Sequence, residues 1–414
     1  MTERRVTVKR RRGEYAETTF STEEPLLAGG HVRSAAIFVL LGLGAFAVAT
    51  GLVLQLYSYP ALAKVSHDID AVSVSQGDGI TALVYAPDGD SVLPQIRHNL
   101  SLTATSHVEG DLSQPEIKQG GDITVWTRST IVKEDTEGLT LSAEVRRMCV
   151  NRHTGESVAP CHGQYYETQQ GKRMTAEGDK LLQPGLSFVF PFNTEQRDYL
   201  WYDTVLEKPR FIRFDGQETM KGLEVYRFVQ IVPPTQVGQF AVPGNMIGRS
   251  EPSVDVAQYY EVTRTLWVEP TTGAVVSARD DARQELRTPE QGEGQGTAVF
   301  DGVLQLNDKS VTWNADTLKK NLPMLSMITT LPVVLWITGG VLVLIALLLL
   351  IFRRSRGWGV GTLVGVVLAV LIGSGVASGV TVAVTTMNNP DSKLDLRTPS
   401  SSSGTGGHVD YGVR

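Results

Sequence analysis

The chain has 414 residues, of which 42% are apolar and 20% are charged, a balance typical of a folded protein rather than a disordered one. Residues 58–327 contain 25 Lys and Arg against 36 Asp and Glu, a net charge of −11. Because contacts to phosphate backbones need a positive surface, this stretch is a poor binder of nucleic acid, and we expect no nucleic-acid partner.

Three segments are apolar and long enough to cross a hydrocarbon layer of about 30 Å. They are residues 34–57, 328–352 and 358–386. None of them contains Asp, Glu, Lys, Arg or His, which argues against a proton-coupled transporter or an ion path through the helices. The sequence therefore predicts a membrane protein with three transmembrane helices.

Positive charge orients these spans. Residues 1–33 hold seven Lys and Arg and the loop 353–357 holds three more, so the positive-inside rule places both in the cytoplasm. Residues 58–327 and the tail 387–414, whose Ser and Gly content predicts disorder, then lie outside. A signal peptide cleaved after Ala63 is the alternative for the first span, but the long leader and the long apolar run favour an uncleaved anchor. The sequence thus predicts a multi-pass protein of the plasma membrane.

The two cysteines, Cys149 and Cys161, both fall in the external region. Outside the cytoplasm a disulfide is the natural state of such a pair. A zinc site from these cysteines with His153 and His162 has the wrong spacing for the usual ligand pairs, and two free thiols are the remaining alternative. We therefore expect a disulfide, with no metal and no other cofactor.

The external region, residues 58–327, has the patterns of β-structure. Apolar and polar side chains alternate over residues 139–146, the period of a half-buried strand. Turn signals built on Pro and Gly recur throughout, whereas helical periodicity is scarce until residues 314–327, which predict a short helix leading into the second span. The expected fold class is α+β: a large β-rich external domain, barrel-like or sandwich-like, held by three transmembrane helices.

A weak internal repeat relates two parts of this region at a constant offset of 118 residues. The matching residues are Arg146 and Arg264, Val150 and Val268, Thr154-Gly155 and Thr272-Gly273, and Val158 and Val276. Each set reads as a strand, a Thr-Gly turn and a returning strand. Two equivalent hairpins would explain the repeat.

The third span carries small residues at every fourth position, along one face of the helix. They are Gly361, Gly365, Ala369, Gly373 and Ala377. Such a face lets another helix approach closely. One interpretation is packing of the three helices within the chain, and the other is docking onto a transmembrane helix of a partner.

The segment 184–203 is rich in aromatic residues. Phe188, Phe190 and Phe192 have the spacing of one face of a strand, and Trp201 and Tyr202 follow. One interpretation is a core strand; the other is the wall of an apolar cavity, which makes these five the candidate ligand-binding residues. The sequence contains no recognisable catalytic motif, so no catalytic residue is assigned and we expect a protein that is not an enzyme.

Several motifs together resemble those of a known family. They are the run Gly185–Glu195, the block Tyr199–Asp203, the segment Lys221–Phe228 and the Arg152-x-Thr154-Gly155 turn before Cys161. Over residues 35–355 the chain is similar to the actinobacterial envelope proteins of the porin PorA family. The resemblance implies an external β-rich domain held by a helix at each end. That plan is also similar to the plan of class B scavenger receptors, which enclose a lipid-conducting tunnel.

Three functions are compatible with these features. The first is an envelope protein that binds or transfers a membrane lipid or glycolipid, such as the mycolyl glycolipid trehalose monomycolate. The second is a non-catalytic scaffold for cell-wall assembly or polar growth, which meets an inner-membrane lipid transporter or assembly proteins through the third helix. The third is an envelope hydrolase or transferase. An apolar cavity in the external domain would support the first function, and a solid core the second.

Overall fold

The computed structural model describes residues 28–88, 91–118, 122–169, 171, 173–175, 183–353 and 360–388. The chain divides into two compact units. The membrane unit comprises Met1–Tyr57 and Thr330–Val384, and the β-unit comprises Ser58–Thr329 and Thr385–Arg414. The predicted leader up to residue 27, loop residues 354–357 and the tail beyond residue 388 lie outside the described residues.

Three helical segments are long and apolar enough to cross a membrane, namely Ala35–Leu62, Thr329–Ile351 and Val364–Thr386. The first consists of α1 (Ala28–Val53), a π-helical turn (Leu54–Ser58) and α2 (Tyr59–Leu62). The other two lie in α4 (Asp308–Arg353) and α5 (Val360–Asn388). The prediction of three candidate transmembrane helices is confirmed. Which side of the membrane each end faces stays a prediction.

Helix α4 begins within the β-unit, well before its apolar span. Asn307 caps its first turn, because its side-chain oxygen accepts the backbone N–H of Ser310 at 2.9 Å, and Asp308 adds a favourable negative charge there. Val311 and Ala315 then pack against Val225 in a buried cluster. The helix predicted over residues 314–327 is therefore present as part of this longer helix.

Ala63, the residue after which a signal peptidase would cut, is buried in the β-unit. Its carbonyl oxygen accepts a hydrogen bond from Nδ1 of His153 at 2.8 Å, and the backbone N–H of Val65 donates to the carbonyl of Arg152 at 2.9 Å. Two hydrogen bonds thus join residues 63–65, which follow the first span, to the turn after strand β4.

The described residues of the β-unit form a single antiparallel sheet of 12 strands. The strands are β1 (Asp70–Asp88), β2 (Ser91–Gly110), β3 (Ile123–Glu134), β4 (Thr140–Asn151), β5 (Tyr165–Thr168), β6 (Arg173–Thr175), β7 (Tyr199–Asp203), β8 (Lys208–Met220), β9 (Leu223–Val242), β10 (Val254–Val268), β11 (Val275–Arg287) and β12 (Thr297–Leu306). Two short helices, α3 (Pro115–Lys118) and a 3₁₀ turn (Gly244–Ile247), lie in connections.

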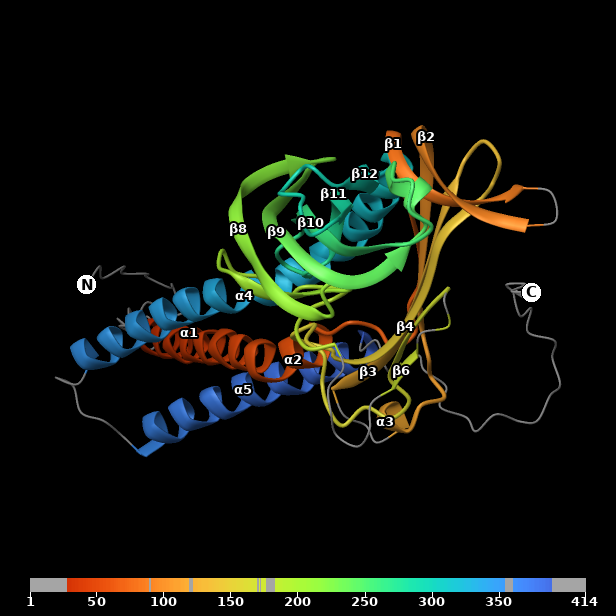
Figure 1. The fold of residues 1–414 in the computed structure, drawn as a ribbon. Coiled ribbons are helices and arrows are strands. Elements are labelled where there is room, and N and C mark those ends of the chain that lie inside the picture. Colours follow the sequence, from red (N-terminus) through yellow and green to blue (C-terminus); the bar gives the residue numbers. More distant parts are fainter. Residues whose placement is uncertain are drawn as a thin grey trace, which may run out of the picture. The chain divides into compact units, whose positions relative to one another are not determined.

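The strand order shows two consecutive meanders side by side. It runs β6-β5-β4-β3-β2-β1-β12-β11-β10-β9-β8-β7, so all strands that are neighbours in sequence pair with each other, except β6 and β7. Strands β1 and β12 pair in the middle, for example Ser75 with Leu306, whereas β6 and β7 stand at opposite edges. The sheet is curled, and β8 and β9 follow pronounced arcs (Figure 1). The predicted α+β class is confirmed, as one curled sheet.

The internal repeat corresponds to equivalent places in the two meanders. Strand β4 of the first and β10 of the second carry Arg146 and Arg264, and each strand ends in a Thr-Gly turn. Gly155 and Gly273 have φ angles of 71° and 73°, and each N–H donates to the carbonyl four residues back at 2.9 Å. The prediction of two equivalent hairpin turns is confirmed.

Candidate functional site

An irregular stretch, residues 183–198, carries most of the aromatic segment, and we call it the crossover. It leads toward β7 at one edge of the sheet from the side of β6 at the other edge. Leu186 forms single β-bridges with Glu156, beyond the turn of β4, and with Trp201 of β7. The crossover therefore links the two meanders by backbone hydrogen bonds as well as by its side chains.

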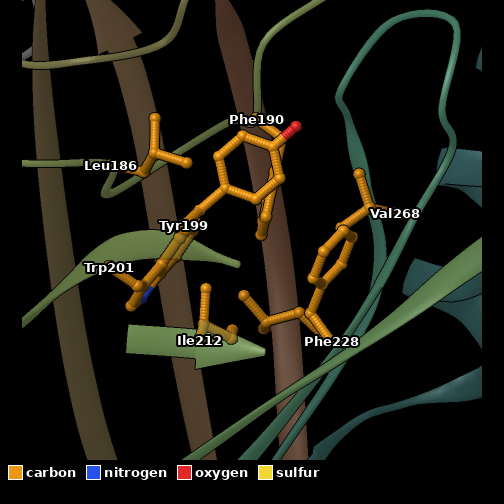
Figure 2. Packing of buried hydrophobic residues seen from close by; sticks show 8 residues of the cluster. Leu186, Phe190, Tyr199, Trp201, Ile212, Phe228 and Val268 are labelled. Atoms are coloured by element: carbon orange, nitrogen blue, oxygen red, sulfur yellow. The ribbon is translucent and has the colours of Figure 1, made fainter. Parts of the chain in front are cut away.

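Phe190 lies at the centre of a packed aromatic cluster. Its side chain is 1% exposed, and Figure 2 shows the neighbouring side chains converging on it. Its ring stacks on Phe228 and Trp201, with centroids 4.6 and 5.4 Å apart, and meets Tyr199 edge to face at 5.3 Å. These rings occupy the space that an apolar ligand would need, so Phe190 is a core residue of the β-unit.

Phe188 and Phe192 lie in other surroundings. The ring of Phe188 meets Trp126 of β3 edge to face at 5.9 Å, and the guanidinium of Arg146 lies 5.3 Å from its centroid. Phe192 is half-buried, and its backbone N–H donates to the carbonyl of His153 at 3.0 Å. The prediction of one strand face shared by the three phenylalanines is wrong, because the backbone of the crossover bonds to two distant hairpin turns instead of running in a ladder.

The two equivalent turns close on adjacent residues of the crossover. The N–H of Phe190 donates to the carbonyl of Gly273 at 2.8 Å. A Cβ atom at Gly273 would lie 2.0 Å from the carbonyl oxygen of Phe190, and one at Gly155 would lie 2.4 Å from that of Val189. Both positions therefore require glycine for close approach as well as for the positive φ angle.

Trp201 and Tyr202 are both buried on β7 and, as neighbours in a strand, point to opposite faces. Burial and the nearby charge of Glu207 raise the pKa of Tyr202 to about 12. Two surface hollows are defined by other residues. One of about 500 Å³ lies along the start of α4, from Asp308 to Lys320, and one of about 200 Å³ lies between residues 205–208 and 235–237. Ligand binding by the five predicted residues stays a prediction.

In the second meander a largely buried arginine, Arg264, has a partner for each of its three guanidinium nitrogens. Arg264 donates from Nε and Nη2 to the two carboxylate oxygens of Asp280, at 2.9 Å each, and from Nη1 to Gln230 at 3.1 Å and Asp203 at 3.3 Å. Tyr260 donates to the same carboxylate of Asp203 at 3.1 Å. Burial opposes the charge of Arg264, but Asp280 and its other partners more than offset it and raise the pKa of Arg264. The charge of Arg264 is therefore balanced by carboxylates within the protein.

In the first meander the equivalent arginine is not paired in this way. Arg146 donates from Nη1 to Gln183 at 3.4 Å, and Arg128, directly opposite on β3, donates from Nη2 to Ser106 at 3.3 Å. Among the described residues, nothing forms a hydrogen bond with the buried Nε atoms of the two arginines or with Nε2 of Gln183. Burial and the neighbouring positive charge of Arg146 lower the pKa of Arg128 to about 10. Glu144 and Asp280 offset part of this charge, but among the described residues no carboxylate is hydrogen-bonded to Arg128 or Arg146.

No sequence motif assigns a function to Arg128, Arg146 or Gln183. Part of the signal was available, because the repeat aligns Arg146 with Arg264. The position of Arg128 opposite Arg146 depends on the register of β3 with β4, and that of Gln183 on the path of the crossover. Neither follows from a local pattern.

Cys149 and Cys161 form the predicted disulfide, buried with Ile117 and Val125. A carboxylate oxygen of Glu116 lies within 4.8 Å of the two sulfur atoms, but that carboxylate accepts hydrogen bonds from the backbone and the ring of His162 at 2.6 and 3.1 Å. Metal ligation by cysteine needs the free thiolate, so the disulfide is incompatible with a zinc site here.

The small residues of α5 pack within the membrane unit. A Cβ atom at Gly373 would lie 2.4 Å from the carbonyl oxygen of Gly42 in α1, and one at Gly365 would lie 2.8 Å from the ring of Phe38. Ala369 packs in the same unit against a buried cluster of α1 and α4, Ala377 is fully buried, and Gly361 lies in the first turn of α5. Docking of a partner through α5 stays a prediction, for which the rest of its surface would serve.

Comparison with known proteins points to one family. The family described as Porin PorA matches residues 37–348. A protein named Porin PorA from Corynebacterium resistens is 26% identical, over 42% of this chain and 58% of its own length. Another of that name from Corynebacterium amycolatum is 24% identical, over 45% and 54%. The chain thus spans little more than half the length of each of these relatives. The resemblance to class B scavenger receptors stays a prediction.

Proposed function

We propose, from the fact that the chain belongs to the porin PorA family, that it is a non-catalytic cell-envelope protein that binds or transfers a long-chain lipid. The lipid class in view is a mycolyl glycolipid such as trehalose monomycolate. The proposal includes a multi-pass anchor in the plasma membrane with the β-unit on its outer side, as the distribution of Lys and Arg favours.

The observation that carries the proposal is an exposed apolar row across three neighbouring strands. Leu200 of β7 pairs with Phe211 of β8. On the other side of β8, Arg213 pairs with Val229 of β9, so the antiparallel register places Ile231 opposite Phe211. These three side chains, the apolar row, are 45%, 61% and 68% exposed. Grouped apolar side chains on a water-facing surface mark a contact site, and on a domain tied to membrane helices an acyl chain is a fitting contact.

The name of the relatives suggests a pore, but the sheet is not built to span a bilayer. A membrane barrel presents an apolar band to the lipid all round its outer face. Beyond Phe211 the exposed face of β8 continues with Arg213, Asp215, Gln217 and Thr219. This face is suited to water, so the candidate membrane contact of the chain is made by its helices.

Lipid binding is tested on the full chain purified in detergent, with co-purifying lipid quantified by mass spectrometry. Ile231→Thr should lower the lipid content by about tenfold, because burying an isoleucine side chain is worth roughly 1.5–3 kcal/mol. Val72→Thr is the matched control, since Val72 is also β-branched and half-exposed on a strand. Equal lipid content in all three proteins would contradict the role of the apolar row.

A second candidate, a scaffold for cell-wall assembly or polar growth, is favoured by the packing of Phe190. A solid aromatic core around this residue is what a domain without an internal lipid requires. In that case the apolar row meets a protein, such as an inner-membrane lipid transporter or an assembly factor. Wild-type protein that carries no lipid, together with a partner that cross-links at position 231 but not at position 72, would establish the scaffold instead.

A further inference from the structure

Arg128 and Arg146 form a registered pair of like charges on adjacent strands. They are direct partners in the β3–β4 ladder, so their side chains leave the same face with Cβ atoms about 5 Å apart. Like charges in this position repel each other and destabilise a sheet. Arg146 is 3% exposed, so water screens the repulsion poorly. A protein that keeps such a pair needs a negative charge between or beside the two guanidinium groups.

The second meander shows how the same place is neutralised from within. There Arg264, the repeat partner of Arg146, stands between Gln230 on β9 and Asp280 on β11. In the first meander the residues paired with Arg146 are Arg128 on β3 and Tyr166 on β5. Arg128 thus occupies the place that corresponds to the neutral Gln230, and Tyr166 the place that corresponds to the carboxylate of Asp280.

Two carboxylates near the arginine pair, Glu144 and Asp280, offset part of the charge of Arg128, but each accepts its hydrogen bonds from other residues. Glu144 accepts a hydrogen bond from the hydroxyl of Tyr166 at 3.2 Å. The ring face of Phe188 attracts the guanidinium group of Arg146. The N–H bonds of a guanidinium group lie in its own plane, so the ring does not serve as their hydrogen-bond acceptor. Within the part of the chain that the structure describes, the Nε atoms of Arg128 and Arg146 and Nε2 of Gln183 therefore remain as three buried donors without an acceptor. Leaving buried donors unpaired is costly, which is why such atoms in a folded protein call for an explanation.

We propose that Arg128, Arg146 and Gln183 form a binding site for the phosphate group of a ligand. Guanidinium groups match the oxygens of phosphate by paired N–H donors, and two of them can neutralise its two negative charges. The amide Nε2 of Gln183 supplies one more donor. Arg128 keeps part of its surface exposed, whereas Arg146 and Gln183 are fully buried, so a ligand would reach the site from the side of Arg128.

The phosphate group could belong to a phospholipid headgroup or to free inorganic phosphate. The site extends the proposed lipid binding to the polar end of a ligand but does not rest on it, since it is inferred from charge and unpaired donors alone. Wild-type protein that carries lipid but binds neither form of phosphate would reject this site only. Phosphate binding by a protein that carries no lipid would reject the proposed function only.

The test uses the full chain in detergent. Equilibrium dialysis against radiolabelled inorganic phosphate forms one arm, and titration with micelles containing phosphatidylglycerol or uncharged glycolipid forms the other. We expect saturable binding in at least one arm, specific for the phosphate compound. Arg128→Gln and Arg146→Gln should each weaken it by about tenfold or more, the effect of losing one charged hydrogen-bonding partner. Binding in both arms identifies a general phosphate site, and binding of phosphatidylglycerol alone identifies a headgroup site.

Arg147→Gln is the matched control. Arg147 is the next residue of β4, points to the opposite face and pairs with Asp111 at 3.2 Å, so its loss should leave phosphate binding unchanged. Melting curves without phosphate give a second readout: Arg128→Gln should melt at or above the wild-type temperature, whereas Arg264→Gln, which strands two carboxylates, should melt below it. Absence of saturable binding by the wild type in both arms, or wild-type affinity in Arg128→Gln, would overturn the proposal.

Discussion

Phe190 is the residue around which the middle of the β-unit packs, with rings on three sides and almost no exposed surface. Replacing it by Trp adds volume to a filled space. We expect Phe190→Trp to lower the free energy of unfolding by about 1–3 kcal/mol, the usual cost of overpacking. Chemical denaturation of the full chain in detergent, followed by the loss of β-sheet circular dichroism, measures the change.

Phe211→Trp is the control for this substitution, because Phe211 is largely exposed and a larger ring finds room in solvent. Its effect on stability should stay within about 0.5 kcal/mol, as for most surface changes. A stability of Phe190→Trp equal to that of the wild type would mean that the cluster contains free space and would favour a cavity beside Phe190 after all.

The two cysteines and the three phenylalanines show where single residues could be understood from sequence. The disulfide was predicted correctly, because the chain has only two cysteines and both lie in the region expected outside the cytoplasm. The alternation of Phe188, Phe190 and Phe192 looked like a strand, but partners for their backbone come from turns far away in sequence. Hydrogen bonds to such distant partners decide the backbone conformation, whatever the alternation of side chains suggests.

At the scale of elements, the two Thr-Gly turns hold the crossover in place through close backbone contacts. Gly273 combines a positive φ angle with a carbonyl oxygen 2.0 Å from where a Cβ would stand. Gly273→Ala should therefore destabilise the β-unit by about 2–5 kcal/mol, the sum of backbone strain and overpacking. The midpoint of urea unfolding checks this value.

Gly248→Ala separates the two contributions. Gly248 has almost the same φ angle, 72°, but no atom lies within 4 Å of a Cβ built there. Only backbone strain of about 1–2 kcal/mol is then expected. Equal losses at both positions would show that the crossover does not depend on its close contact with the turn.

The elements themselves were predicted unevenly. Helices were accessible because caps, spans and helical periods are local, and α4 differs only in starting earlier, at the Asn307 cap. The repeat correctly indicated two equivalent turns. The arginine site was not accessible, because it needs the register of β3 with β4 and the return of the crossover to Arg146. These pairings are set by the whole sheet.

At the scale of the molecule, the sequence could predict an anchored β-rich domain but not the order of its strands. Alternation reports which residues are strands, and not which strands are neighbours. The pairing of β1 with β12 and the separation of β6 from β7 have no local signature. The orientation in the membrane rests on the basic residues that flank the spans, and it can be tested directly.

Single reporter cysteines give the orientation, because the native pair is already oxidised and silent. Ser253 is an exposed residue before β10, and a cysteine there should react with an impermeant thiol reagent in intact cells. A cysteine at Ser21, in the basic leader, should react only after lysis, and one at Ser402 in the tail should react in intact cells. Labelling at 21 with protection at 253 would reverse the topology.

The pairing of β1 with β12 has a consequence for how this chain is made. During synthesis β1 can pair with β2 at once, but its other edge stays open until β12 emerges, after nearly all of the domain. The segment that completes the sheet is followed directly by α4, which carries the second span. Closure of the domain is therefore a late, long-range step that coincides with insertion of that span. A chain stopped before Thr297 should leave β1 as an open edge, prone to aggregation.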